Sequence, residues 1–294
     1  MPMECEGRVA IVTGASKGGT GTAIALRLAA EGAAVALVAR DEDGLDATAS
    51  RIRGAGGTAL VMPVDLSDPD GGRDELVSSV TAELGAVDIL VNNAAVNGYR
   101  PFTDWTARRL ELAQQVNVWA PWRLMVDVAA SMRERGQGWI VNITSFAGEL
   151  PPGPPFPTNV VATAGSAYGS TKAALNRLTV SVAAELYDAG IAVNALAPQS
   201  AIATPHLVEA GQVDPERFEP LETMAEAVLL LATCDAAAVT GRIERSLELL
   251  VEFDRPVRTL DGHELLAEWQ PAELVAVIDR HRAHLADRGW PDAF

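Results

Sequence analysis

Short apolar runs, each bounded by turn residues, alternate with helical patterns along most of the chain. Continuous apolar runs of this kind are typical of strands buried on both faces of a parallel sheet. We expect strands at residues 8–13, 34–39, 59–64, 87–91, 139–144, 191–196 and 242–251. Helical patterns occupy residues 22–31, 45–53, 73–84, 106–135 with a bend near Pro121, 167–189 and 224–232. This alternation predicts an α/β fold, a doubly wound parallel sheet of about seven strands with helices on both faces and a ligand at the carboxyl ends of the strands.

The composition restricts the classes of function. The 294 residues carry a net charge of −16, which argues against binding to nucleic acid or to an anionic membrane surface. No apolar stretch approaches the roughly 20 residues that span a bilayer, and the N-terminus lacks the pattern of a secretory signal. Two cysteines, Cys5 and Cys234, and four histidines form no disulfide framework and no ligand cluster. We therefore expect a cytoplasmic protein without a metal site.

A glycine-rich turn, TGASKGGTG at residues 13–21, directly follows the first predicted strand and opens into a helix. Glycines permit a tight turn and a close approach of the backbone to a pyrophosphate. The helix N-terminus then offers unpaired N–H groups and the positive end of its dipole. Between a strand and a helix, such a turn predicts a dinucleotide site.

This turn resembles the TGxxxGxG turn of the short-chain dehydrogenase/reductase family, with one extra residue that leaves the register of the phosphate contacts open. The segments YGSTK, which begins at Tyr168, and VNITS, which ends at Ser145, are also similar to the family pattern, and the resemblance covers about residues 7–245. It implies a Rossmann fold and an oxidoreductase that interconverts a small carbonyl compound and an alcohol by hydride transfer. It also implies a homodimer or homotetramer.

The end of the second predicted strand indicates which cofactor is used. NAD enzymes of this fold usually place a carboxylate where this chain has Ala39, and Arg40 follows instead. A 2′-phosphate would be attracted by Arg40 and by Lys17, so NADP(H) is favoured over NAD(H). The alternative is that Arg40 is a surface residue paired with Asp41 or Asp43.

Further cofactor contacts are implied by the resemblance. Asp65 would lie beside the adenine ring, with a helix-capping role as the alternative. Thr204 would contact the nicotinamide carboxamide or the diphosphate, although Gln199 replaces the usual glycine and shifts the spacing by one residue. The predicted cofactor-binding residues are Gly14, Ser16, Lys17, Gly19, Gly21, Arg40, Asp65, Leu66, Asn92, Ala94, Tyr168, Lys172 and Thr204.

Tyr168 and Lys172 are four residues apart, so on a helix they lie on one face. An unperturbed tyrosine has a pKa of about 10, too high for a base near neutrality, and a nearby ammonium lowers it. We therefore expect Tyr168 to be the acid/base group, with an ordinary helix surface as the alternative. The resemblance implies that Ser145 donates a hydrogen bond to the substrate oxygen. It also implies that Asn117 holds a water in the proton relay, the alternative being an asparagine bonded to backbone.

Two segments interrupt the pattern. Residues 149–165 contain five prolines and form an insertion between Ser145 and Tyr168, whose contact survives only if the insertion loops out and returns. Residues 252–294 form a C-terminal extension with one amphipathic helix that starts near Pro271 and carries one apolar stripe, Leu274, Ile278 and Leu285. We expect residues 1–251 to be a single catalytic domain in which residues 199–220 form a substrate lid.

The apolar insertion favours a hydrophobic carbonyl substrate. An alternative function is a non-catalytic regulatory or scaffold protein that binds the cofactor, and a third is a dehydratase or epimerase on the same fold. The presence of Ser145, Tyr168 and Lys172 disfavours both.

Overall fold

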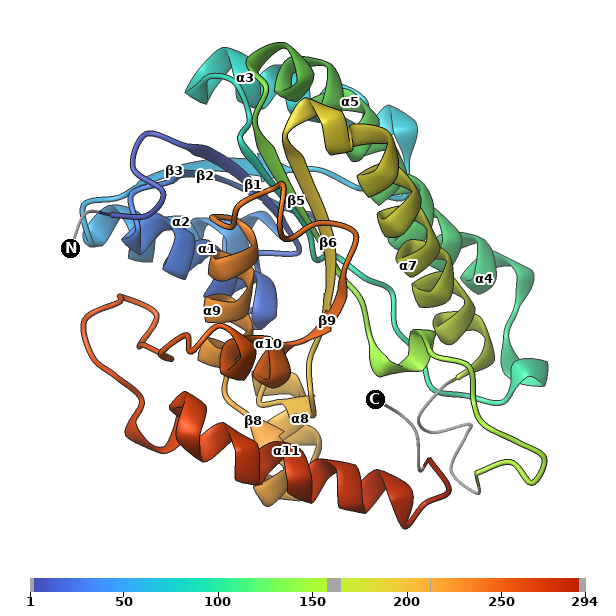
Figure 1. The fold of residues 1–294 in the computed structure, drawn as a ribbon. Helices are drawn as coiled ribbons and strands as arrows, with labels where there is room; N and C mark the ends of the chain where they lie inside the picture. Colours follow the sequence, from blue (N-terminus) through green and yellow to red (C-terminus); the bar gives the residue numbers. More distant parts are fainter. Residues whose placement is uncertain (1–2, 158–164, 212, 291–294) are drawn as a thin grey trace.

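A seven-stranded parallel sheet runs through the centre of the computed structural model, which describes residues 3–157, 165–211 and 213–290 (Figure 1). The spatial order is β3-β2-β1-β4-β5-β6-β9. The strands are β1 (Val9–Thr13), β2 (Ala34–Ala39), β3 (Thr58–Pro63), β4 (Ile89–Asn92), β5 (Gly138–Ile143), β6 (Ile191–Ala197) and β9 (Ile243–Arg245). The chain crosses from β3 to β4 beside β1, which creates the switch point at which ligands bind in such sheets. The predicted doubly wound fold is confirmed.

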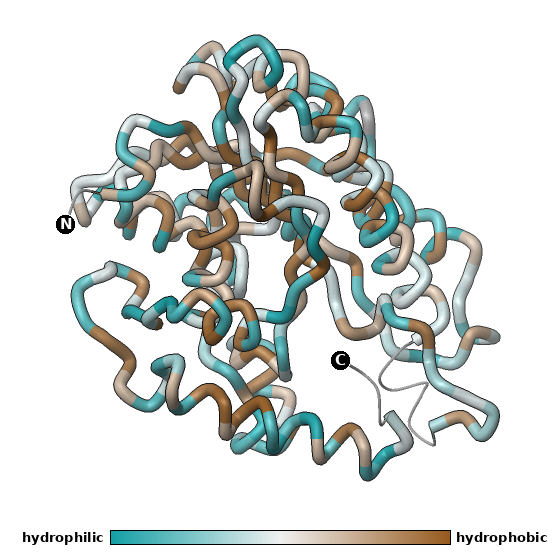
Figure 2. The backbone as a smooth tube through the Cα atoms, in the orientation of Figure 1, coloured by the Kyte–Doolittle hydropathy of each residue, from teal (hydrophilic) through white to brown (hydrophobic). Residues whose placement is uncertain are grey.

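Helices cover both faces of the sheet (Figure 1). One face packs against α1 (Thr20–Ala30), α2 (Glu42–Gly54) and α9 (Leu221–Leu231), and the other against α3 (Leu76–Leu84), α5 (Ala120–Arg135) and α7 (Ser166–Leu186). Successive β1 residues alternate between the two cores, because neighbouring side chains of a strand point to opposite faces. The central strands are therefore mainly apolar, and Figure 2 shows hydrophobic residues gathered in the middle of the molecule.

The long helix predicted at residues 106–135 is divided. A π-helical turn, η3 (Gln115–Trp119), joins α4 (Ala107–Gln114) to α5. Pro121 has no N–H to donate to the carbonyl of Asn117, four residues earlier, and its ring crowds that carbonyl. The irregularity therefore lies just before the proline, as a widened turn of the kind often found at functional sites.

The predicted last strand, residues 242–251, is wrong over most of its length. β9 has only three residues, and α10 (Ser246–Glu252) follows it at once. This segment consists mainly of leucine and glutamate, which are strong helix formers. Its leucines pack as a helix between α9 and the C-terminal helix, and a short apolar run does not by itself distinguish that helix from a buried strand.

The C-terminal extension lies against the carboxyl end of the sheet. Its helix α11 (Pro271–Ala286) buries the predicted stripe of Leu274, Ile278 and Leu285. It runs beside the short elements that follow β6, namely β7 (Ala201–Ile202), α8 (Pro205–Ala210) and β8 (Phe218–Glu219) (Figure 1). Among the described residues, no helix combines the length and the apolar character needed to cross a bilayer.

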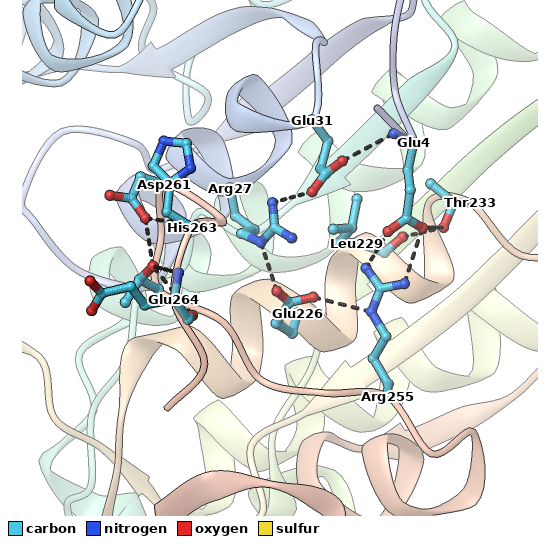
Figure 3. Close-up of polar contacts among 11 residues, drawn as sticks. Glu4, Arg27, Glu31, Glu226, Leu229, Thr233, Arg255, Asp261, His263 and Glu264 are labelled. Atoms are coloured by element: carbon cyan, nitrogen blue, oxygen red, sulfur yellow. Dashed lines mark hydrogen bonds and ion pairs between the residues drawn. The ribbon is translucent and has the colours of Figure 1, made fainter. Parts of the chain in front are cut away.

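A buried ion network fixes the start of this extension to the sheet's helical layer (Figure 3). Glu226 of α9 is fully buried and accepts from the Arg27 Nε at 2.7 Å and the Arg255 Nε at 3.2 Å. Arg27 also pairs with Glu31, and Arg255 with Glu4. The network thus joins the N-terminal segment, α1, α9 and the extension through one carboxylate.

We expect Glu226→Ala to lower the free energy of unfolding by about 3–5 kcal/mol, because it removes the fully buried carboxylate that pairs with both Arg27 and Arg255. Glu222→Ala, on the same helix and without a described partner, should change it by less than about 0.5 kcal/mol. Urea unfolding of both variants measures the difference. Equal stability of the two variants would contradict this role of Glu226.

Candidate active site

The glycine-rich turn forms a cradle between β1 and α1 that only glycine permits. A Cβ atom on Gly21 would lie 2.3 Å from the Gly14 carbonyl oxygen and 2.5 Å from the Asn93 Nδ2. Gly14 has a φ of +73° and is equally crowded by Asn93. No side chain caps the N-terminus of α1 at Gly19, so its first N–H groups remain available to an anion. These features fit the diphosphate of a dinucleotide.

A cleft of about 370 Å³ extends from this cradle along the ends of β2, β3 and β4. Nine of the predicted cofactor residues line it: Gly14, Ser16, Lys17, Gly19, Gly21, Arg40, Asp65, Leu66 and Ala94. Thr204 lies beside the cleft, with its Cγ2 3.5 Å from the position of a Cβ on Gly19. The structure therefore brings these residues to one edge of the sheet.

Asn92 is placed elsewhere. Its side chain donates to the Asn142 Oδ1 at 2.8 Å inside the sheet. The next residue, Asn93, lines the cleft instead and donates to the Thr13 carbonyl at 2.8 Å. Sequence reasoning chose the first asparagine of the pair. β4 ends at Asn92, so the side chain of Asn92 still follows the alternation of the strand and points into the sheet. Asn93 lies after the strand, and its side chain can turn into the cleft.

Arg40 and Asp65 face the same part of the cleft. Arg40 is exposed and forms no ion pair with a described residue, while Asp41 caps α2 through the Gly44 N–H. Burial opposes the ionisation of Asp65, but hydrogen bonds from Ser67 and the charge of Arg40 lower the pKa of its carboxyl group. The guanidinium group of Arg40 is thus available to a phosphate.

Ser145, Tyr168 and Lys172 converge at the carboxyl end of β5. Ser145 follows the strand by two residues, and its hydroxyl is hydrogen-bonded to Tyr168 in the first turn of α7. Lys172, 2% exposed, donates from Nζ to the Ile143 carbonyl at 2.7 Å, with Nζ 5.7 Å from the centroid of the Tyr168 ring. The chain therefore returns to β5 after the insertion, of which residues 158–164 lie outside the described residues.

Asn117 lies behind this group in the π-helical turn and is fully buried. Its Oδ1 accepts from the Val96 N–H at 2.7 Å. Its Nδ2 donates to the Val96 carbonyl at 2.9 Å and to the Thr171 Oγ1 at 3.0 Å. The side chain is bonded to protein groups, so it joins α7 to the loop after β4.

The ionisation of the pair differs from the expectation that Lys172 lowers the pKa of Tyr168. Burial, together with the neighbouring Tyr99, raises the pKa of Tyr168, and the hydrogen bond with Ser145 offsets this only in part. Burial also lowers the pKa of Lys172 to about 8. The expectation fails because Nζ is held at the Ile143 carbonyl and desolvation dominates at both groups.

Tyr99 is a site residue that sequence reasoning missed. Its ring meets that of Tyr168 edge to face, with centroids 5.6 Å apart, and its hydroxyl is also hydrogen-bonded to Ser145. It lies in the loop after β4, which has no periodic pattern to indicate it. Two phenols thus share the Ser145 hydroxyl.

Comparison with known proteins agrees with this geometry. Residues 8–213 match the family model of the short chain dehydrogenases. The chain belongs to the short-chain dehydrogenase/reductase family. The prediction of an NAD(P)-dependent enzyme of this family is confirmed. The cleft lies at the switch point of the sheet.

The chain is similar to a fatty acyl-CoA reductase of Mycobacterium tuberculosis, with 36% identity over 192 residues, 65% of this chain and 62% of that protein. It thus spans less than two thirds of that relative. The 3-oxoacyl-[acyl-carrier-protein] reductase of Escherichia coli is 34% identical over 248 residues, 81% of this chain and 95% of the relative. A metagenomic short-chain oxidoreductase, solved in complex with NADP, superimposes with a TM-score of 0.68 at 33% identity, covering 82% of this chain and 98% of that structure.

We expect Gly21→Ala to weaken NADPH binding by about tenfold or more, because the new methyl group opens the cradle at the Gly14 carbonyl. The matched control is Gly54→Ala in α2, where a Cβ meets nothing within 4 Å. Titration of cofactor fluorescence measures both affinities. If the Gly21 variant bound NADPH as the control does, the cradle would not hold the diphosphate.

Proposed function

We propose that the protein interconverts a secondary alcohol and a carbonyl group by hydride transfer with NADP(H), and that Tyr168 is the acid/base group. The observation that carries this proposal is the buried Tyr168 phenol, hydrogen-bonded to Ser145 and beside Lys172, at the carboxyl end of the sheet. The reductase relatives support the same class of reaction.

The residues around the cleft fit the parts of the cofactor. The cradle at Gly14 and Gly21 and the free end of α1 would hold the diphosphate. Arg40 and Lys17 would bind the 2′-phosphate, for which a planar guanidinium offers two parallel hydrogen bonds. Asp65 would lie beside the adenine ring. When bound, NADP(H) supplies or accepts the hydride at C4 of its nicotinamide ring.

The raised pKa of Tyr168 keeps its phenol in the form that donates a proton in carbonyl reduction. At neutral pH the phenol stays protonated, so it can donate its proton to the carbonyl oxygen as negative charge develops there. Ser145 donates a second hydrogen bond to the same oxygen. Lys172, whose Nζ donates to the Ile143 carbonyl, holds Tyr168 and the first turn of α7 against the end of β5.

The described part of the insertion supports an apolar substrate. Leu150 and Phe156 are 88% and 61% exposed. Neither side chain belongs to a hydrophobic core cluster of the described residues. We propose that they contact the apolar body of the carbonyl compound, with residues 199–220 as the lid on its other side.

We also propose that the protein forms homodimers through the helical face around η3 and α5. Trp119 and Trp122 are 52% and 41% exposed, and their rings meet edge to face with centroids 5.8 Å apart. Val126, four residues after Trp122 on the same helix, is also exposed. Exposed apolar patches of this kind are typical of interfaces. Sedimentation of the purified protein tests the association.

The cytoplasmic location stays a prediction from the cysteine content.

We expect Tyr168→Phe to lower kcat for carbonyl reduction by about 100-fold or more, because the proton donor is lost. NADPH affinity should remain within about twofold. Tyr187→Phe, at the exposed end of α7, is the control and should keep full activity. Unchanged turnover in the Tyr168 variant would remove the acid/base assignment. Absence of turnover in the unmodified protein with a broad carbonyl panel would favour the scaffold alternative.

We expect Arg40→Asp to raise the Kd for NADPH by about 10- to 100-fold, because it replaces an attractive charge with a repulsive one beside the 2′-phosphate. The Kd for NADH, which lacks this phosphate, should change by less than about threefold. Arg108→Asp in α4 makes the same change of charge outside the cleft and controls for net charge. Equal effects on both cofactors would contradict the preference for NADP(H).

A further inference from the structure

A second cavity, of about 570 Å³, lies between the lid segment and the C-terminal helix α11. Ser200 and Arg217 line it from the lid side, and Arg280, His281 and His284 line it from successive turns of α11. The match to the family model ends at residue 213, before α11 begins. The wall of the cavity that α11 forms therefore lies outside the matched segment.

Two buried nitrogen atoms in this region, the Arg217 Nε and the His284 Nε2, have no hydrogen-bond partner among the residues that the structure describes. Buried polar atoms of this kind are rare, because each has given up its hydrogen bond to water without a replacement. Both residues line the same cavity. A ligand with acceptor oxygens would satisfy both.

Two arginines and three carboxylates line the cavity, namely Arg217 and Arg280 with Asp214, Glu216 and Glu219. Neither Arg217 nor Arg280 forms an ion pair with a described residue. After burial, the charges of Arg217 and Arg288 lower the pKa of His284, and the charge of Asp287 raises it. Burial and the charges of Arg245, Arg217 and His284 likewise lower the pKa of His281 to about 4.

The acidic groups on the lid side face protein donors. Asp214 accepts from the Glu216 N–H. Glu219 is fully buried and accepts from the Ser200 N–H, the Thr223 hydroxyl and the Ser246 hydroxyl. Glu216 is exposed at the rim.

Side-chain contacts connect the cavity to the catalytic group. Phe146, next to Ser145, lies under the Arg245 guanidinium, with Cζ 5.0 Å from the ring centroid, and against Trp290 at 4.7 Å. Arg245 in turn influences His281 at the cavity wall. The extension thus reaches Phe146, the residue that adjoins Ser145.

We propose that this cavity binds an oxyanion, a carboxylate or a phosphate, at the far end of the carbonyl substrate, with Arg217 and Arg280 as its cations and His284 as a hydrogen-bond donor. The proposal rests on the proposed function for the substrate's carbonyl end. Guanidinium groups suit either oxyanion, because each can donate two parallel hydrogen bonds. The substrate would then have an apolar body beside the insertion and a charged end beneath α11.

The first experiment measures binding alone. Inorganic phosphate is titrated calorimetrically into the full chain saturated with NADPH, so that phosphate does not occupy the dinucleotide cleft. We expect Arg280→Met to weaken phosphate binding by about tenfold or more. Arg282→Met, on the same helix but paired with Glu248, should leave it unchanged. Equal phosphate affinity in both variants, or none in the unmodified protein, would overturn the site.

The second experiment asks whether the oxyanion belongs to the substrate. Keto acids with increasing chain length between ketone and carboxylate are compared with their methyl esters. We expect a kcat/KM preference of about tenfold or more for one length of acid, lost in Arg280→Met through KM, with ester turnover unchanged. Phosphate binding without any preference for the acids would overturn the assignment to the substrate. Turnover of neither series, with phosphate binding intact, would count against the proposed function and leave the oxyanion site standing.

Discussion

The geometry of the site depends on how α7 is docked against the end of β5. The buried ammonium of Lys172 needs an acceptor, and the Ile143 carbonyl at 2.7 Å provides it. Gly148, in the short helical turn after Ser145, allows the two elements to approach, since a Cβ there would lie 3.0 Å from the backbone of Lys172. This single contact sets the distance between Ser145 and Tyr168 whatever the length of the insertion between them.

Desolvation then determines the chemistry of the docked groups. The same burial that holds Lys172 against β5 lowers its pKa, and it raises the pKa of Tyr168. Both shifts favour the neutral forms, because a low-dielectric environment disfavours charge of either sign. A protonated phenol beside a serine hydroxyl is a donor pair, which suits the proposed reduction of a carbonyl group.

The C-terminal extension is attached at both ends by side chains of the catalytic unit. Glu226 holds its beginning through Arg255, and Phe146 receives Trp290 at its end. Between these points α11 covers the lid segment and places its arginine and histidine side chains against it. Under the proposed function, an extension of this kind can reshape the substrate cleft while the proposed catalytic residues stay unchanged.

The sequence by itself determined the alternation of strands and helices, the glycine-rich turn and the catalytic spacing on α7, because each depends on residues close together in the chain. Only the tertiary structure decided that residues 246–252 form a helix, that Asn93 rather than Asn92 lines the cleft, and that Tyr99 lies beside Ser145. It also placed the Lys172 ammonium on a carbonyl of β5. The physical reason is that packing, desolvation and hydrogen-bond partners come from segments distant in sequence, which local periodicity does not encode.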